Sequence, residues 1–386
     1  AGSSRMEAVQ APVIPDVAAL LRECPDAISL GQGVVHYPPP PQVFSAVRDF
    51  GSNAADHHYR DAAGIPELRE GLRAKLTRDN GITLDDGAQS IFVTAGSNMA
   101  FYHIVLCLCD PGDEVVVMSP FYFNHEMAIV MANSRPVMAR TDDAFGLQPE
   151  AVEAVLTPRT RAIVTISPNN PSGAVYDADA LRQINDLCQQ RGIVHISDEA
   201  YEYFTYDEAE HLSPGSLPES AQHTVSLFSF SKSHALANWR VGYMVVPNWL
   251  LRGLQKSQDT ILICPPVISQ VAALGALSAG REYCQPFIDE LARVRSMALE
   301  HLAILGERCK VPTADGAFYL LARLDSPLTP MQLVERLVRE HGVAAIPGSG
   351  FGLDACHLRI AYGALDADSV EEGMNRLVRG LQSILG

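Results

Sequence analysis

Seven short apolar runs between residues 90 and 247 constrain the fold more than any other feature of this sequence. They are rich in valine and isoleucine and lack polar alternation, which is typical of strands buried on both faces of a sheet. Segments with helical periodicity separate them. The runs are 90–95, 114–118, 136–139, 162–167, 194–197, 224–228 and 241–246, and the helical segments are 99–108, 124–132, 149–155 and 178–190.

Alternation of strands and helices predicts an α/β fold, with a mainly parallel seven-stranded sheet between two helical layers. Ligands of such sheets bind beyond the carboxyl ends of the strands. After residue 248 the pattern changes to helices at 267–279, 282–308, 330–341 and 367–385, with strands at 316–321 and 357–361. We expect a large domain at 45–265 and a smaller α+β domain at 266–386, against which the N-terminal residues 1–44 pack.

Lys232 is one of only four lysines in the chain, and it lies just after the apolar run 224–228. A lysine at the mouth of a buried strand is a candidate for Schiff-base formation, because partial desolvation lowers its pKa and frees the amine. Ser229 precedes it by three residues and Arg240 follows it by eight. A hydroxyl and a guanidinium so placed suit a phosphate group. An isolated lysine would more simply be a surface residue of a loop.

Two further strand ends carry polar groups. Gly96, Ser97 and Asn98 join the first strand to a helix, where backbone N–H groups and the positive end of the helix favour a phosphate. Asn170 follows the fourth strand within the turn Pro-Asn-Asn-Pro-Ser-Gly, and its amide can donate to a ring oxygen. Either turn alone is structurally routine.

Asp198 directly follows the fifth strand, and Tyr201 comes three residues later. A buried aspartate normally requires a cationic partner, and a protonated pyridine nitrogen would serve. Arg359 lies on a short strand near the C-terminus, where it suits bidentate binding of a carboxylate. For Arg359 alone, a structural salt bridge is the simpler interpretation.

Composition excludes several classes of protein. The formal charge of −16 opposes non-specific binding to nucleic acid or to an anionic membrane. No apolar stretch reaches the length of a membrane span. The eight cysteines are scattered, and no Cys/His grouping has the spacing of a zinc site, so we expect reduced thiols, a cytoplasmic protein and no metal.

The order of these motifs resembles the fold-type I pyridoxal-phosphate enzymes, and specifically the class I/II aminotransferase family. The resemblance covers nearly the whole chain. It rests on Asn-Asn-Pro-Ser-Gly at 169–173, Asp-Glu-Ala-Tyr at 198–201, Ser-Phe-Ser-Lys at 229–232 and Trp-Arg-Val-Gly-Tyr at 239–243.

The resemblance implies pyridoxal 5'-phosphate as cofactor, amino-acid and 2-oxo-acid substrates, and a homodimer. It implies that Lys232 forms the internal aldimine and moves protons, and that Asp198 pairs with the pyridine nitrogen. The remaining roles follow in the same way: Tyr201 and Asn170 on the ring's phenolic oxygen; Tyr122 stacked on the ring; Gly96, Ser97, Asn98, Ser229 and Arg240 around the phosphate; Tyr59 reaching the partner subunit's phosphate; Arg359 on the substrate carboxylate; and Gly33 in the loop that closes over it.

Some residues depart from the family pattern. His234 stands where an aromatic residue is usual, Asn238 replaces a glycine, and His36 and the pair His57-His58 lie near the expected cofactor mouth. Each histidine alone is more simply a surface or core residue. Together they leave open β- or γ-elimination, replacement or cyclisation of a substrate such as S-adenosylmethionine or an arginine derivative, with His36 and His234 as substrate-binding candidates. A sensor domain of a transcription regulator is a third hypothesis, but the chain lacks a basic helix-turn-helix stretch. The sequence does not identify the substrate side chain.

Overall fold

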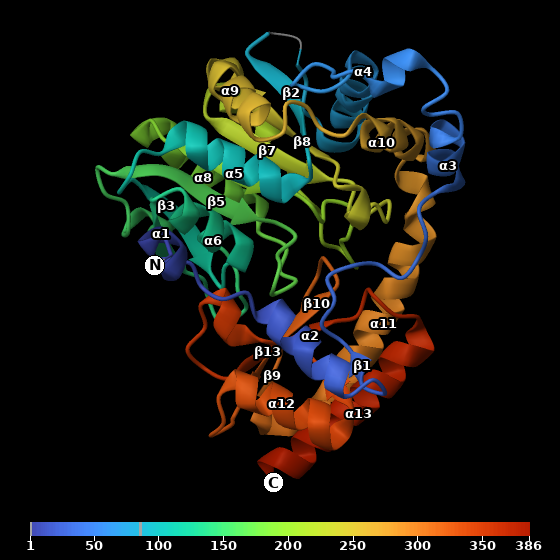
Figure 1. The fold of residues 1–386 in the computed structure, drawn as a ribbon. Coiled ribbons are helices and arrows are strands. Elements are labelled where there is room, and N and C mark those ends of the chain that lie inside the picture. The colour runs from blue at the N-terminus through green and yellow to red at the C-terminus, as the bar shows by residue number, and fades with distance from the viewer. Residues whose placement is uncertain (1, 85–86) are drawn as a thin grey trace.

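The structure, a computed structural model, describes residues 2–84 and 87–386. Its main feature is a seven-stranded sheet in the order β2-β8-β7-β6-β5-β3-β4 (Figure 1). β8 runs antiparallel to both neighbours and the other pairs are parallel, so the mainly parallel sheet predicted from the sequence is confirmed. The strands are β2 (Gln89–Thr94), β3 (Glu114–Ser119), β4 (Arg135–Arg140), β5 (Thr160–Ile166), β6 (Val194–Asp198), β7 (Thr224–Ser229) and β8 (Gly242–Pro247).

Helices cover both faces of this sheet. On one face, Phe101 of α5, Ile129 of α6 and Leu254 of α9 share a core with sheet residues. On the other face, α4 and α10 pack over the β2–β8 end, and α7 and α8 pack over the β3–β5 end. These helices are α4 (Pro66–Lys75), α5 (Ser97–Leu108), α6 (Phe123–Met131), α7 (Pro149–Glu153), α8 (Ala178–Arg191), α9 (Leu251–Ile261) and α10 (Val267–Ala279). The predicted three-layer arrangement is therefore confirmed.

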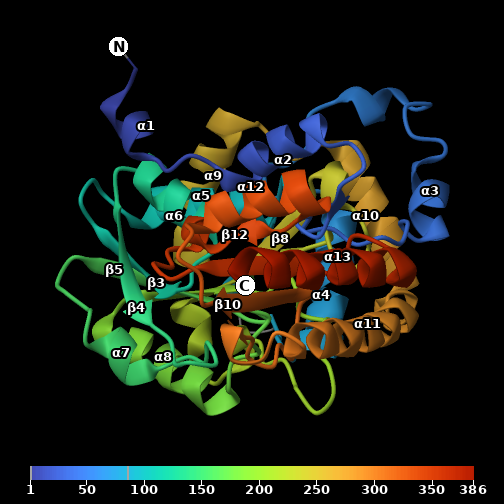
Figure 2. The ribbon, with the colours of Figure 1, turned by 90° about the horizontal axis from the view of Figure 1, so that it is seen from below.

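The C-terminal part forms the smaller unit, drawn in orange and red in Figures 1 and 2. An antiparallel sheet in the order β12-β13-β10-β9 packs with three helices around one core. Its elements are α11 (Gln285–Ala303), β9 (Cys309–Lys310), β10 (Tyr319–Leu324), α12 (Pro330–His341), β12 (Ile346–Pro347), β13 (His357–Ala361) and α13 (Ala367–Leu385). β10 starts three residues later than predicted, because Gly316 forms an isolated bridge with Thr205 and the chain then turns at Ala317 (φ 54°) and Phe318.

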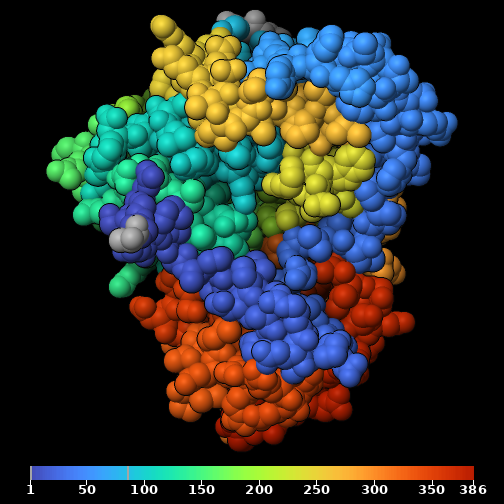
Figure 3. Space-filling model, in the orientation of Figure 1, coloured from blue at the N-terminus to red at the C-terminus, as the bar shows by residue number. Residues whose placement is uncertain are grey.

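The N-terminal segment joins the two units. β1 (Ile28–Ser29) pairs in parallel with β11 (Val343–Ala344), and α2 (Val13–Glu23) packs beside α12, which confirms the expected packing on the C-terminal unit. α1 (Ser4–Ala8) and the residues after it reach the large domain instead, where the Gln10 amide donates to Glu126 Oε2 at 2.7 Å. Figure 3 shows this segment, in dark blue, crossing the junction between the two units.

The domain boundary after residue 265 stays a prediction. α10 bears on it, because Ala272, Ala273 and Ala276 share a core with Ile91 and Val93 of the large sheet. α10 also packs against α3 (Pro41–Val47) and α4. This packing favours counting α10 with the large domain.

Candidate active site

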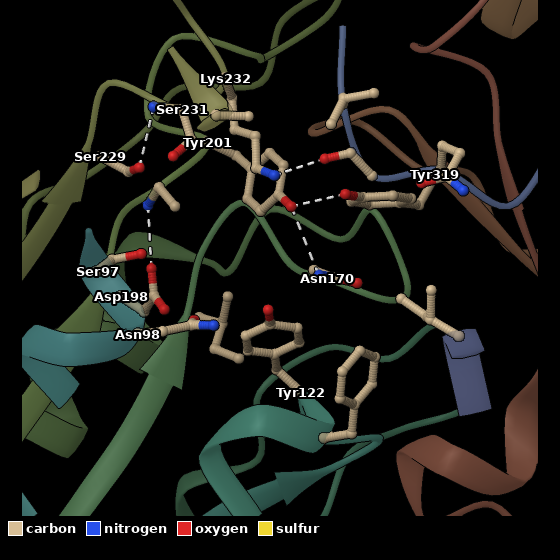
Figure 4. Close-up of a pocket in the computed structure, with 18 of the residues that line it drawn as sticks. Ser97, Asn98, Tyr122, Asn170, Asp198, Tyr201, Ser229, Ser231, Lys232 and Tyr319 are labelled. Carbon is tan, nitrogen blue, oxygen red and sulfur yellow. Dashed lines mark hydrogen bonds between the residues drawn. The ribbon is translucent and has the colours of Figure 1, made fainter. Parts of the chain in front are cut away.

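A cavity of about 420 Å³ lies at the carboxyl ends of the central strands, where the large sheet meets the smaller unit. Its walls come from the N-terminal segment, from the loops after β2, β3, β5, β6 and β7, and from β10 and β13 (Figure 4). The lining residues are Ile14, Gln32, Gly33, Val34, Ser97, Asn98, Tyr122, Phe123, Ile166, Asn170, Asp198, Ala200, Tyr201, Ser229, Ser231, Lys232, Ala237, Arg240, Tyr319 and Arg359. The structure thus brings together most of the site residues predicted from the sequence.

Lys232 enters the cavity from the turn after β7. Its ammonium donates to the backbone carbonyl of Gly33 at 2.5 Å and lies 5.9 Å from the centre of the Tyr201 ring. Desolvation, together with the guanidinium groups of Arg359 and Arg240, lowers the pKa of Lys232 to about 8. An amine with this pKa is partly neutral near neutral pH, as a nucleophile toward a carbonyl must be.

Asp198 ends β6 with its carboxylate buried in the cavity wall. Oδ1 accepts the backbone N–H of Ala200 at 3.1 Å, and Oδ2 lies 3.0 Å from Nε2 of His125. The His125 ring stacks on Phe101 with 3.9 Å between ring centres. His125 was not singled out from the sequence, because a histidine on an amphipathic helix resembles an ordinary core residue.

Tyr201, one turn beyond Asp198, belongs to a group of hydroxyl and amide side chains. Its hydroxyl lies 2.6 Å from that of Tyr319 and 3.5 Å from Nδ2 of Asn170 (Figure 4). Tyr319 was also not predicted as a site residue, because it lies in an apolar run that the sequence assigns to a strand of the smaller domain. Gly33 passes close to Tyr319, where a Cβ atom would lie 2.7 Å from the hydroxyl.

Arg359 is 1% exposed and projects from β13 into the cavity wall. Nη1 donates to Oδ1 of Asn170 at 2.9 Å, and Nη2 donates to the carbonyl of Gly31 at 2.8 Å. The guanidinium also lies over the Tyr319 ring, 4.6 Å from its centre. No carboxylate among the described residues lies within 4.0 Å of it, so its charge lacks an anionic partner from this chain.

A cradle for an anion forms where α5 begins. Gly96, at φ 87°, is the residue before the helix, and a side chain there would collide with the guanidinium of Arg240. Ser97 and Asn98 open α5, whose N-terminal N–H groups attract negative charge. Ser229 reaches the same cavity from the end of β7. Ser231, which the sequence argument did not single out, donates its backbone N–H to Ser229 Oγ at 3.0 Å.

Tyr122 immediately precedes α6, and its ring faces the cavity beside Asn98 (Figure 4). The Asn124 amide donates to its hydroxyl at 2.8 Å. Burial raises the pKa of Tyr122. An aromatic face at this place suits stacking on a planar ring.

Four predicted residues, Gly96, Tyr59, His36 and His234, are not among those that line the cavity. Gly96 lies just before α5, close to the guanidinium of Arg240. Tyr59 is 77% exposed on the outer surface. His36 packs at right angles to Tyr37 and Phe287, and its Nε2 lies 3.8 Å from Glu290.

His234 is buried among aromatic rings, between Phe230 and Tyr203. Its ring nitrogens face Ser233 Oγ at 2.9 Å and the carbonyl of Gly280 at 3.3 Å. Burial lowers the pKa of His234 to about 4. The ring is therefore held neutral in the core rather than at the cavity.

A desolvated lysine, a buried carboxylate and an arginine without an anionic partner define a site for a ligand that carries both a carbonyl and negative charge. Comparison with known proteins identifies the class. Residues 25–377 match the family of class I and II aminotransferases, and this chain belongs to that family.

The similarity extends over complete relatives. The chain is 33% identical to aromatic aminotransferase ISS1 of Arabidopsis thaliana, over 99% of this chain and 97% of that protein. It is 33% identical to aspartate/prephenate aminotransferase of Thermus thermophilus, over 94% and 93%. The structure of a single mutant of T. thermophilus aspartate aminotransferase superposes with a TM-score of 0.91 at 31% identity, covering 98% of this chain and 99% of that one.

The chain is accordingly a pyridoxal-phosphate-dependent aminotransferase. The residues present fit the cofactor. The α5 cradle offers donors and a guanidinium to a phosphate, Asp198 offers a buried anion to a pyridinium, and Lys232 offers an amine to the aldehyde. Among the described residues, no helix is long and apolar enough to cross a membrane.

Proposed function

We propose that this enzyme transfers the α-amino group of an L-amino acid with an uncharged side chain, using Lys232, Asp198 and Arg359. The observation that carries the proposal is the state of Arg359. Burying a guanidinium without an anion costs several kcal/mol, which a bound carboxylate offsets. Two parallel N–H groups also match the geometry of a carboxylate.

The charges around the cavity support an uncharged side chain. Among the described lining residues, Asp198, Lys232, Arg240 and Arg359 are the charged ones. In our assignment the cofactor's pyridine nitrogen, aldehyde and phosphate engage the first three, and the substrate carboxylate engages the fourth. No charge then remains for a second carboxylate or a cationic side chain. The apolar residues Ile14, Val34 and Phe123 also line the cavity.

When bound, pyridoxal phosphate acts as an electron sink for the carbon that loses a proton. The residues of this chain would orient the reactants and move that proton. The Lys232 amine would carry the proton, because its lowered pKa matches the operating pH of a general base. Asp198 would keep the pyridine nitrogen protonated, and Tyr201 and Asn170 would donate to the phenolic oxygen.

The remaining assignments concern position rather than proton transfer. Gly96, Ser97, Asn98, Ser229 and Arg240 would hold the phosphate, and Tyr122 would cover one face of the ring. Gly33 would keep the N-terminal segment close to the substrate. Its carbonyl already accepts a hydrogen bond from Lys232.

The elimination, replacement and cyclisation hypothesis gains no support. It depended on extra acid–base groups at the cavity, yet neither His36 nor His234 lines it. His57 and His58 are exposed, and His57 faces the carbonyl of Gly51.

We also infer a homodimer in which Tyr59 reaches the partner subunit's cofactor. The Arg60 backbone N–H lies 3.5 Å from Cys264 Sγ, so the exposed Tyr59 and Ile263, which directly precede these two residues, lie on neighbouring segments. Sedimentation should give twice the chain mass, and Tyr59→Phe should weaken cofactor binding without dissociating the dimer. The eight free cysteines support a cytoplasmic location, where thiols stay reduced.

A substrate panel tests the proposed activity. Holoenzyme is mixed with pyruvate as amino acceptor and with phenylalanine, leucine, aspartate or arginine, and 2-oxo-acid formation is measured. We expect kcat/KM for phenylalanine or leucine to exceed that for aspartate and arginine by about tenfold or more, since an unpaired buried charge is costly. Preference for aspartate or arginine would overturn the substrate assignment. Lys232→Ala serves as the inactive control.

A further inference from the structure

The pair formed by Tyr201 and Tyr319 links the two units of the molecule inside the cavity. Tyr201 follows β6 of the large sheet, whereas Tyr319 begins β10 of the smaller one. Their hydroxyl oxygens lie 2.6 Å apart, and their rings meet at 79°. Both side chains are buried, at 4% and 0% exposure, and Figure 4 shows them facing each other across the site.

The surrounding contacts determine which hydroxyl donates. Arg359 Nη1 donates to Oδ1 of Asn170, so the other end of that amide, Nδ2, faces the Tyr201 oxygen. Tyr201 therefore accepts from Asn170. If Tyr201 also donated to Tyr319, the Tyr319 proton would need an acceptor, and no further hydrogen bond of that hydroxyl is found among the described residues.

The arrangement that gives every hydroxyl proton of the pair an acceptor once a ligand is bound has Tyr319 donating to Tyr201. Tyr201 then accepts from Tyr319 and Asn170 and keeps its own proton for a ligand. Donors in such a chain polarise one another, which strengthens the final hydrogen bond. Burial raises the pKa of Tyr319 to about 12, so it stays protonated as a donor.

We propose that Tyr319 is a positioning residue that orients the Tyr201 hydroxyl and strengthens it as a donor to the cofactor's phenolic oxygen. This inference rests on the proposed function, in which Tyr201 binds that oxygen. The Arg359 guanidinium also lies over the Tyr319 ring. Leu321, on the same strand as Tyr319, is the β-sheet partner of Arg359 on β13. One strand thus supports both the donor chain and the carboxylate site.

The test uses holoenzyme and follows the visible absorption of the bound cofactor against pH. A donor to the phenolic oxygen stabilises the more negatively charged form, which dominates at high pH. Weakening that donor therefore moves the midpoint upward. We expect Tyr319→Phe to raise the midpoint by about 0.5 to 1 pH unit, the scale of one hydrogen bond. The other titratable or charged lining groups, Tyr122, Asp198, Lys232, Arg240 and Arg359, are unchanged by this substitution.

A double-mutant cycle shows whether Tyr319 acts through Tyr201. Tyr201→Phe should raise the midpoint at least as much, and adding Tyr319→Phe to it should give no further shift. Tyr206→Phe is the matched control, because Tyr206 is buried nearby and bonds the carbonyl of Ala317 without lining the cavity. Its midpoint should equal that of the wild type.

Two results would overturn the inference. One is an unchanged midpoint in Tyr319→Phe with an unchanged melting temperature. The other is full additivity of the two shifts, which would assign Tyr319 a separate role. If instead the wild type shows no cofactor band that depends on Lys232, the proposed function itself fails, and that outcome is distinct from both.

Discussion

Nε2 of His125 lies 3.0 Å from Oδ2 of Asp198, and both side chains are buried beneath the cavity. The other carboxylate oxygen is held by the N–H of Ala200. Phe101 stacks on the imidazole and holds the ring beside the carboxylate before any ligand binds. A carboxylate fixed in this way favours a cation at one place, such as a protonated ring nitrogen.

Asp198→Asn should lower kcat by roughly 10²- to 10³-fold, the scale of removing one member of a buried ion pair. His125→Gln keeps a polar side chain beside the carboxylate and should lower kcat only about tenfold. Single-turnover kinetics with the preferred amino acid measure both. Asp179→Asn, on the exposed surface of α8, is the control. A near-normal rate in Asp198→Asn would contradict the role of this carboxylate.

Arg359→Lys should raise KM for the amino acid by roughly 10²-fold, because a point charge cannot replace two parallel N–H donors to a carboxylate. A direct readout is ligand-induced stabilisation. A carboxylate analogue of the substrate should raise the melting temperature of the wild type but not that of Arg359→Met. An equal rise in both proteins would place the carboxylate elsewhere.

Lys232 should destabilise the unliganded protein at neutral pH. Its pKa falls from 10.5 to about 8 on folding, so between these values the unfolded chain binds more protons and stability rises with pH. The loss of folding stability that Lys232 causes is fully present below about pH 8. Lys232→Met should therefore raise the free energy of unfolding by roughly 3 kcal/mol at pH 7, at about 1.36 kcal/mol per pKa unit, and by much less above pH 10.

Denaturant unfolding of cofactor-free protein at pH 7 and pH 10 checks this dependence. Lys256→Met, at an exposed position of α9, should change little at either pH. A difference between Lys232→Met and wild type that stays constant with pH would exclude titration of Lys232 as the cause.

Lys75 belongs to a buried polar network with Asn80 and Glu202. Its ammonium donates to both carboxylate oxygens of Glu202, at 2.6 and 2.5 Å, and Lys75 is 5% exposed. Lys75→Met should destabilise the fold by roughly 3–5 kcal/mol, because it leaves a buried carboxylate unpaired. Denaturant unfolding of Lys75→Met and of the exposed control Lys310→Met provides the comparison. Equal stability of the two variants would show that Glu202 finds another partner or a proton.

Much of the fold follows from periodicity. Strands buried on both faces of a sheet appear in the sequence as continuous apolar runs. Helical periodicity also predicted the bounds of α10, α12 and α13, which begin and end at the predicted residues. The antiparallel direction of β8 could not be predicted from the sequence, because an apolar run has the same pattern in a parallel and in an antiparallel strand. At the site, residues just beyond strand ends were predictable, since parallel strands bring their carboxyl ends to one edge.

The remaining site residues depend on packing that local pattern does not encode. Tyr319 is 118 positions from Tyr201, and their contact exists only because the smaller unit docks on the large one. His234 lies away from the cavity because its ring packs between Phe230 and Tyr203. Its ring nitrogens face Ser233 Oγ and the carbonyl of Gly280. Proximity in sequence to Lys232 therefore did not place His234 at the cavity.

The cavity wall begins at Ile14 and ends at Arg359, and it includes strands from both units. During synthesis, Lys232 and Asp198 leave the ribosome more than a hundred residues before Arg359 does. A nascent chain can therefore assemble the large sheet while one wall of the site is still absent. Only after β13 has paired with β10 does Arg359 join Lys232 in the wall of the cavity.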